Sequence, residues 1–231
     1  FVMESFPIFI NLKEKPVTII GGGDIALRKV KLLIKADPKI TVISKVVCSD
    51  LKELMKQHDH KIVIKSFQES DLKTPVLIIA ATNNPKLNKR ISTYAQQNNI
   101  LINVVDQPKL CTFTMGSIVE RDSLVISISS GGKAPVLVRN IREKIETVIP
   151  QSYAELVRFS GSLRSVIKKK IQSGVKRRIF WEEFFNSDYI QKFILNPKKL
   201  NLKVFNKILS SMKNKKKRYA RRIIIIYIIN I

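Results

Sequence analysis

The chain has 231 residues, 45% of them hydrophobic, which is enough for one large or two small domains with a real core. Its net charge of +24 favours a polyanionic ligand, either nucleic acid or a carboxylate-rich small molecule. Two distant cysteines, Cys48 and Cys111, exclude a disulfide framework and a C-x-x-C zinc site, and they favour a reducing cytoplasm. No apolar run reaches the roughly 18–20 residues that span a bilayer, and residues 1–12 lack the basic start of a signal peptide. We therefore expect a soluble, cytoplasmic protein without a membrane partner.

A glycine-rich stretch near the amino terminus organises the expected fold. Residues 17–20 form a short β-branched run that is typical of a buried strand. Gly21, Gly23 and Ala26 follow it with the Gly-x-Gly-x-x-Gly/Ala spacing of a dinucleotide-binding turn. Gly21 permits the tight turn, Gly23 lets the backbone approach a pyrophosphate, and Ala26 allows close helix–strand packing. A purely structural turn is the alternative.

The next strand departs from the usual dinucleotide fingerprint. The helix after the glycine turn is expected to end at Asp37–Pro38, and residues 40–43 to form the second strand. An acidic residue at the end of this strand would hold the adenosine ribose, but the sequence has Ser44 and Lys45 there. The choice between NAD and NADP stays open, because Lys45 could equally meet a phosphate.

The first 112 residues alternate strands with helices. Further strands are expected at 62–66, 76–82 and 100–105, and helices at 50–58 and 87–98, with residues 7–11 as an edge strand or lead-in. This alternation predicts an α/β fold, a Rossmann-like doubly wound parallel sheet that forms a dinucleotide-binding domain over residues 1–112.

The rest of the chain has a different character. Strands at 112–119 and 123–129 and a helix at 135–149 form an expected segment over 113–150. Helices at 153–172 and 175–185 have apolar residues at helical spacing and predict a C-terminal α-helical domain, 151–196. The basic, Ile-rich tail, 197–231, could be a membrane-surface tail, a nucleic-acid arm or a degenerate end, and we favour a degenerate or disordered end.

Asp106 is the carboxylate whose position best fits catalysis. It lies at the carboxyl end of the strand expected at 100–105, where α/β sheets bind ligands. An Asx turn or a helix cap before Pro108 is the structural alternative. His58 and His60 stand in a polar turn without further donors evident, so we expect solvated side chains there and no metal site.

Several segments resemble the amino-terminal half of the siroheme synthases, in order over roughly residues 6–196. They are Phe6–Phe9, Ile19–Ala26 with Arg28 and Lys29, Ala80–Thr82, Asn103–Pro108, Phe113–Ile118, Ser129–Gly132 with Pro135 and Val136, Arg177 with Arg178, and Phe180–Phe185. The resemblance implies a bifunctional enzyme. Its precorrin-2 dehydrogenase activity passes a hydride to NAD⁺, and its sirohydrochlorin ferrochelatase activity inserts Fe²⁺ to give siroheme. The preference for iron or cobalt stays open.

The resemblance also implies roles for single residues. The nucleotide contacts match Asp24, Ile25, Lys45 and Val46, beside Gly21 and Gly23 of the glycine turn. Asp106 matches the catalytic carboxylate, which suits a general base in both reactions. Ser130 matches a position that can carry a phosphoserine, where a dianionic phosphate would repel a polycarboxylate tetrapyrrole and lower activity.

Substrate binding and assembly complete these expectations. Arg139 and Arg142 are candidate anchors for the tetrapyrrole carboxylates, with a solvated helix face as the equal alternative. The resemblance implies a homodimer that pairs residues 113–150 and the helices with a second subunit. The 35 residues after Asn196 cannot hold the methyltransferase domain of full-length family members, so we expect another source of precorrin-2. The alternatives are a non-catalytic NAD-binding remnant and a nucleic-acid binder acting through the basic tail, which the sequence disfavours.

Overall fold

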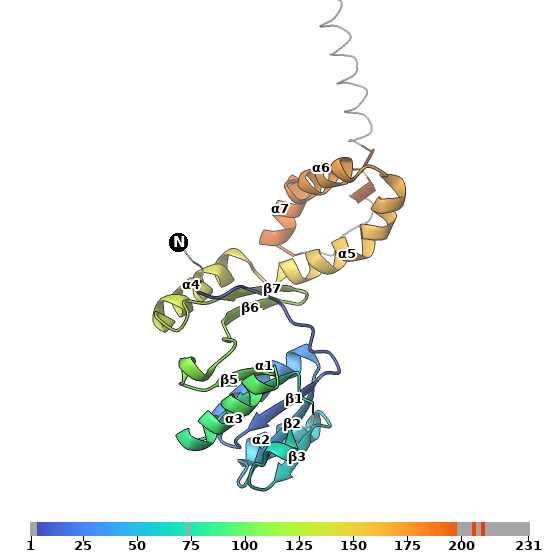
Figure 1. Ribbon diagram of the computed structural model, residues 1–231. Coiled ribbons are helices and arrows are strands. Elements are labelled where there is room, and N and C mark those ends of the chain that lie inside the picture. The colour runs from blue at the N-terminus through green and yellow to red at the C-terminus, as the bar shows by residue number, and fades with distance from the viewer. Residues whose placement is uncertain (1–3, 73, 198–204, 207–208, 211–231) are drawn as a thin grey trace, which may run out of the picture. The chain divides into compact units, whose positions relative to one another are not determined.

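The computed structural model describes residues 4–72, 74–197, 205–206 and 209–210, and it divides into two units (Figure 1). The first unit comprises the residues up to Gly116 together with Ser129–Pro135. The second comprises Ser117–Ile128 and the residues from Val136 onward. Each unit has its own hydrophobic core.

The first unit is built on a five-stranded parallel sheet. The strands are β1 (Pro16–Ile20), β2 (Lys39–Ser44), β3 (Lys61–Ile64), β4 (Leu77–Ala80) and β5 (Leu101–Val104). They lie in the order β3-β2-β1-β4-β5, and each neighbouring pair is parallel. The direction of winding changes between β1 and β4, so the predicted Rossmann-like, doubly wound fold is confirmed.

Two hydrophobic layers cover the two faces of this sheet. Because side chains alternate along a strand, Val17 and Ile19 of β1 face one layer and Ile20 faces the other. The first layer contains buried residues of α1 (Asp24–Leu33) and α2 (Ser49–Gln57), and the second contains those of α3 (Pro85–Gln97). The sheet is therefore buried on both sides, which explains the nearly continuous apolar runs of its central strands.

Local signals in the sequence end and begin the helices of this unit. A 3₁₀ turn at Ile34–Ala36 follows α1, and Asp37 then adopts the left-handed conformation (φ 55°) ahead of Pro38. Asn84 caps α3, because its side-chain oxygen accepts a hydrogen bond from the N–H of Leu87 at 3.0 Å.

The second unit contains a hairpin and the helices α4 to α7. The hairpin pairs β6 (Ser117–Arg121) with β7 (Leu124–Ile128) in antiparallel register. The helices are α4 (Pro135–Val148), α5 (Ser152–Lys170), α6 (Gly174–Phe185) and α7 (Asp188–Leu195). Their core is strongly aromatic and includes the buried side chains Phe180, Phe184, Phe193, Phe205 and Leu209. The predicted C-terminal helical part is confirmed.

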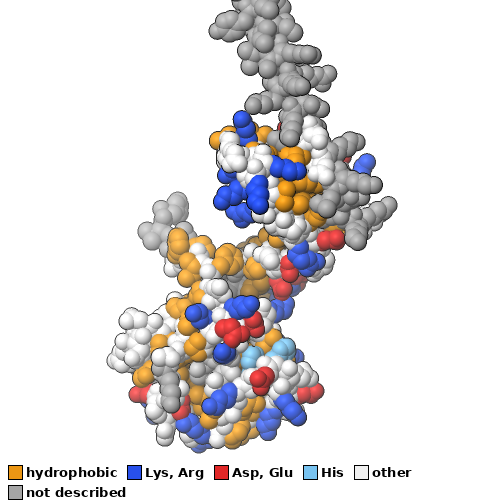
Figure 2. Space-filling view, turned by 90° about the vertical axis from the view of Figure 1, so that its right-hand side faces the viewer, with side chains coloured by type: hydrophobic (Ala, Val, Ile, Leu, Met, Phe, Trp, Pro, Cys, Tyr) orange, Lys and Arg blue, Asp and Glu red, His pale blue; other side chains and the backbone are white. Residues whose placement is uncertain are grey.

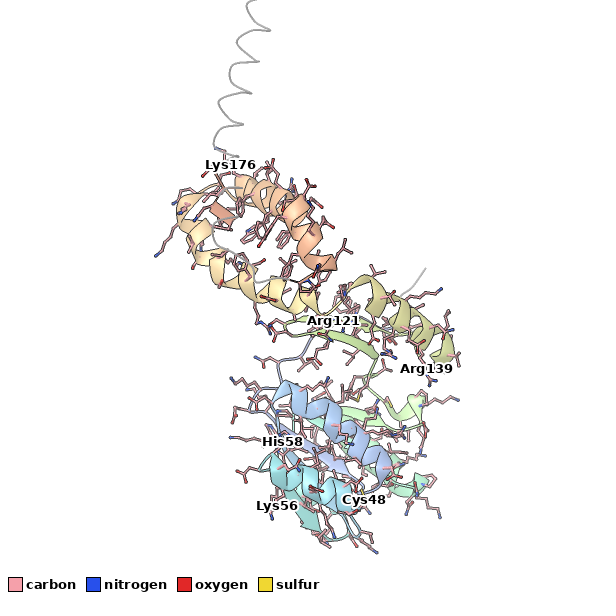
Figure 3. The ribbon with its side chains drawn as sticks, turned by 180° about the vertical axis from the view of Figure 1, so that it is seen from behind. Cys48, Lys56, His58, Arg121, Arg139 and Lys176 are labelled. Carbon is pink, nitrogen blue, oxygen red and sulfur yellow. The ribbon has the colours of Figure 1, made fainter. Side chains whose placement is uncertain are left out.

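Arg121 ties the hairpin to the end of α4 within the second unit (Figure 3). Its side chain is buried, and the guanidinium donates to the backbone carbonyls of Ile149 at 2.7 Å, Glu120 at 2.8 Å and Glu146 at 3.4 Å. Two of these carbonyls lie at the carboxyl end of α4, where the negative end of the helix dipole favours a cation.

Three local predictions were wrong or incomplete. The strand expected at 112–119 begins only at Ser117, because Thr112 hydrogen-bonds back to Ile102 of β5 through both its backbone and its hydroxyl. Residues 7–11 form no strand. The short helix α7 was not predicted, although Ser187 precedes it in extended N-cap geometry.

The expected tail, 197–231, lies almost entirely outside the described residues. Of its described part, Phe205 and Leu209 are buried in the core of the second unit. The domain boundaries of the sequence analysis stay predictions. Among the described helices, none combines the length and hydrophobicity that a bilayer crossing requires.

Candidate active site

A cleft of about 1060 Å³ opens at the carboxyl ends of β1, β2 and β4. This volume is near the upper end of the usual range for small-molecule sites, about 300–1,000 Å³. Its lining brings together all six residues that the sequence assigned to the nucleotide: Gly21, Gly23, Asp24, Ile25, Lys45 and Val46. These six residues come from the segments after β1 and β2, which thus converge on one site at the edge where open α/β sheets bind ligands.

The three glycines after β1 differ in what surrounds them. Gly21 has φ +124°, and a Cβ there would lie 2.1 Å from the carbonyl oxygen of Ala81. A Cβ on Gly22 would lie 2.1 Å from the carbonyl oxygen of Val46. A Cβ on Gly23 would meet nothing within 4 Å. Gly21 and Gly22 are therefore required by packing, whereas the space beside Gly23 is open for a ligand.

The start of α1 supplies hydrogen-bond donors for an anion at this open space. Gly23 is the extended N-cap residue of α1 and provides no side-chain cap. The first N–H groups of a helix have no partner within it, and the positive end of its dipole favours phosphate. The cleft lining adds four basic side chains, Lys45, Lys65, Lys86 and Arg90, against one acidic side chain, Asp24, within the described chain. The residues present fit a dinucleotide.

The loop after β3 contributes a rim that the sequence analysis missed. The guanidinium of Arg90 lies 5.7 Å from the centre of the Phe67 ring and 3.4 Å from the Glu69 carboxylate. Lys65 pairs with Asp71. Burial alone would raise the pKa of Asp71, but the hydrogen bonds from Lys65 and from a backbone N–H outweigh it and lower that pKa. No sequence motif marks this rim, because Phe, Lys and Arg are common residues at such positions.

The loop after β4 is fixed by a buried amide. Thr82 Oγ1 donates to Asn88 Oδ1 at 2.6 Å, and Asn88 Nδ2 donates back to the Thr82 carbonyl at 3.0 Å. Asn88 is 2% exposed, whereas Thr82 lines the cleft. The two hydrogen bonds therefore hold Thr82, a residue of the cleft wall, in place from the buried side of the loop.

Asp106 lies at the end of β5, on the same edge of the sheet as the cleft, but it is not among the cleft-lining residues. It is exposed and has φ 57°, in a turn that the N–H of Gln107 closes by donating to the Val104 carbonyl at 3.3 Å. The structure thus places this carboxylate on a tight turn that faces solvent.

Lys29 of α1 is a charged residue to which the sequence analysis assigned no role. It is half-buried, and its ammonium donates to Met115 Sδ at 3.5 Å. Burial lowers the pKa of Lys29 below 10.5, and Arg28 lowers it further, while the charges of Asp106 and Cys111 raise it. The signal was available, because Lys29 comes three residues after Ala26 and so adjoins the buried stripe of α1.

The loop that carries Ser130 begins with two hydroxyl contacts to the backbone. Ser130 Oγ accepts a hydrogen bond from the N–H of Ala134 at 3.0 Å, and Ser129 Oγ accepts one from Gly131 at 3.2 Å. Lys133 pairs with Glu4 at 2.5 Å. Ser130 is not among the residues that line the cleft.

The remaining candidates have local partners or stand at the surface. Arg139 is exposed on α4 (Figure 3), whereas Arg142 pairs with Glu146 at 2.6 Å on the same helix. His58 and His60 stack with ring centres 6.1 Å apart and form a patch on the surface (Figure 2). In the described part of the chain, no group of three or more His, Cys, Asp or Glu side chains could hold a metal ion.

Comparison with known proteins gives the class first. An NAD(P)-binding family model matches residues 8–117, in agreement with the fold and the cleft. The model of the sirohaem biosynthesis protein central region matches residues 121–147, and that of the sirohaem synthase dimerisation region matches residues 152–193. These matches show that the chain is similar to the amino-terminal part of the siroheme synthases, and the resemblance found in the sequence is confirmed.

Individual relatives agree with this family. Siroheme synthases of Ruthia magnifica subsp. Calyptogena magnifica and Vesicomyosocius okutanii subsp. Calyptogena okutanii are 47% and 46% identical over 192 and 190 residues. Each match covers 82% of this chain, which spans 40% and 41% of the length of these relatives. The solved structure of SirC, a precorrin-2 dehydrogenase, has a TM-score of 0.69 and 22% identity and covers 91% of this chain and 100% of its own. At that identity it supports the fold.

Proposed function

We propose that this protein oxidises precorrin-2 to sirohydrochlorin with NAD⁺ and inserts Fe²⁺ into the product to give siroheme. The observation that carries the dehydrogenase assignment is the open space beside Gly23 at the start of α1, within a cleft of dinucleotide size. The naming of SirC as a precorrin-2 dehydrogenase and of the relatives as siroheme synthases supports the choice of substrate.

In this proposal Asp106 is the base. Oxidation removes one hydride and one proton from precorrin-2, and bound NAD⁺ supplies the hydride acceptor. The Asp106 carboxylate at the end of β5 takes the proton. During chelation the entering Fe²⁺ displaces two protons from pyrrole nitrogens, and the same carboxylate is their first acceptor. Its exposure on a turn gives a large macrocycle access to it.

The cleft residues hold the nucleotide in this proposal. The N–H groups of Asp24 and Ile25 would hold the pyrophosphate, and Lys45 and Val46 would border the adenosine end. Ser44 stands where an acidic residue would select NAD, and its hydroxyl donates to the Val46 carbonyl at 2.8 Å. A comparison of NAD⁺ with NADP⁺ as oxidant therefore belongs in the first assay.

We also propose a homodimer and control through Ser130. The match to a sirohaem synthase dimerisation region supports the dimer, and light scattering after gel filtration would measure its mass.

A phosphate on Ser130 would add negative charge to the loop that begins α4 and repel a polycarboxylate substrate. Ser130→Asp is expected to weaken substrate binding, measured as a higher KM for precorrin-2.

The experiment that tests this function compares wild type with Asp106→Asn. NADH formation is followed anaerobically with precorrin-2 and NAD⁺, and siroheme formation with sirohydrochlorin and Fe²⁺. Loss of a positioned base is expected to lower kcat about 10²- to 10⁴-fold, while calorimetric affinity for NAD⁺ stays within about twofold of wild type, since Asp106 lies outside the cleft lining. Asn tolerates the left-handed turn, so the backbone should be preserved.

Asp59→Asn is the matched control. Asp59 is also an exposed aspartate with positive φ, 52°, but it lies after α2, and its variant should keep wild-type kcat. Equal activity of Asp106→Asn and wild type would remove Asp106 from the mechanism. A folded wild type that binds NAD⁺ but forms neither product would instead identify a non-catalytic remnant.

A further inference from the structure

The turn that carries Asp106 is closed mainly by one side chain. Asp106 has positive φ, 57°, which is an uncommon conformation for a residue with a side chain. Such a conformation costs of order 1–3 kcal/mol and persists only when surrounding contacts determine it. The contact within the turn is a 3.3 Å hydrogen bond from Gln107 N–H to the Val104 carbonyl, which is long for its kind.

The thiol of Cys111 contacts both ends of this turn. The N–H of Val104 donates to Cys111 Sγ at 3.1 Å. The sulfur in turn lies 3.3 Å from the Val104 carbonyl and 3.4 Å from the Gln107 carbonyl, to either of which the S–H can donate. One half-buried thiol therefore joins the residue where β5 ends to the residue just after Asp106.

The chain that follows Cys111 is anchored to β5, and the Asn103 amide that takes part also donates to Cys111 Sγ at 3.7 Å. Asn103 Nδ2 donates to the Phe113 carbonyl at 3.1 Å, and the Ile102 N–H donates to Thr112 Oγ1 at 2.9 Å. The position of Cys111 beneath the turn is thus fixed by β5 itself. Removal of the thiol would leave the N–H of Val104, a residue 2% exposed, without this acceptor.

We infer that Cys111 is a positioning residue of the reaction: its thiol holds the turn that presents the Asp106 carboxylate to the substrate. This role rests on the proposed function of Asp106 as the base. Displacement of a catalytic group by about 1 Å can cost about 10²-fold in rate, so loosening this turn should lower kcat without touching the nucleotide cleft.

The test compares Cys111→Ala and Cys111→Ser with Met55→Ala. The alanine variant is expected to lower kcat for NADH formation at least about tenfold, with the calorimetric Kd for NAD⁺ within twofold of wild type. Serine keeps a donor and an acceptor and should restore part of kcat. Met55 is a fully buried residue of α2, so its truncation destabilises the same unit but should leave kcat unchanged.

A second readout separates this inference from the proposed function. Amide hydrogen exchange at Val104 and Gln107 should accelerate in Cys111→Ala while exchange in β1 stays at the wild-type rate. If wild type forms no NADH, the proposed function fails, yet this local exchange still supports the thiol's hold on the turn. Unchanged exchange at both amides, or a wild-type kcat in folded Cys111→Ala, would overturn the inference.

Discussion

Two turns at the same edge of the parallel sheet are held by opposite means. The turn after β1 is held by missing side chains, because Gly21 and Gly22 let the backbone pack against the carbonyls of Ala81 and Val46. The turn after β5 is held by side-chain hydrogen bonds, between its backbone and the thiol of Cys111, four residues beyond Gln107, and between Ile102 and the hydroxyl of Thr112. At Gly21 and Gly22 the first turn has no room for a Cβ, whereas the second turn depends on side-chain atoms that a substitution removes.

The largest expected effect comes from adding one methyl group to the first turn. Gly21→Ala places a Cβ 2.1 Å from a backbone oxygen at φ +124°, so neighbouring strands must move. We expect a loss of stability of about 3 kcal/mol or more, in the range of severe backbone and packing defects. Urea unfolding measures it. A variant as stable as wild type would show that the backbone after β4 can shift at little cost in free energy.

Gly23→Ala sharpens the comparison within the same turn. Since its Cβ meets nothing within 4 Å, the variant should keep the wild-type melting temperature. The methyl group nevertheless occupies the open space where the pyrophosphate would lie, so NAD⁺ affinity should fall at least about tenfold, or about 1.4 kcal/mol. Calorimetry with NAD⁺ measures this loss, and full affinity would place the phosphates elsewhere.

A smaller effect is expected beside the second turn. Thr112→Val removes the hydroxyl that accepts the Ile102 N–H at 2.9 Å while keeping the side-chain shape. An orphaned buried donor costs about 1–3 kcal/mol, so the variant should unfold at lower urea concentration yet still bind NAD⁺ like wild type. A fall in NAD⁺ affinity would mean that the two turns are coupled.

The smallest expected effect concerns Lys29, whose replacement should raise the stability of the fold instead of lowering it. Because the pKa of Lys29 is lowered from 10.5 in the folded state, the unfolded chain binds this proton more readily. Stability therefore rises with pH between the folded pKa and 10.5, and at neutral pH the buried charge destabilises the fold. Lys29→Met should raise the melting temperature near pH 7.5, with the difference from wild type shrinking as pH approaches 10.5. A lower melting temperature at pH 7.5 would contradict this.

The contrast between the turns explains what the sequence could predict. Gly21 follows a strand at a recognisable place because its steric demands admit few residue types, so the sheet and the first turn were predicted from the sequence, whereas the rim of the cleft after β3 was not. Lys29 was not assigned, since its hydrogen bond to Met115 joins residues 86 apart in the sequence, and Cys111 was not assigned, since no motif marks its contacts with the backbone of Val104 and Gln107. The place of Asp106 at the end of a strand was predicted from the sequence. The contact of the Cys111 thiol with its turn is visible only in the structure.

Arg121 illustrates how such a chain can tolerate mutation. Its guanidinium is fixed by the backbone carbonyls of residues 120, 146 and 149, and every amino acid supplies the same carbonyl. Substitutions at those three positions therefore leave the acceptors in place, and genetic drift there is buffered as long as the arginine persists. The join between the hairpin and α4 therefore depends on one side chain, that of Arg121, and not on which side chains these three positions carry.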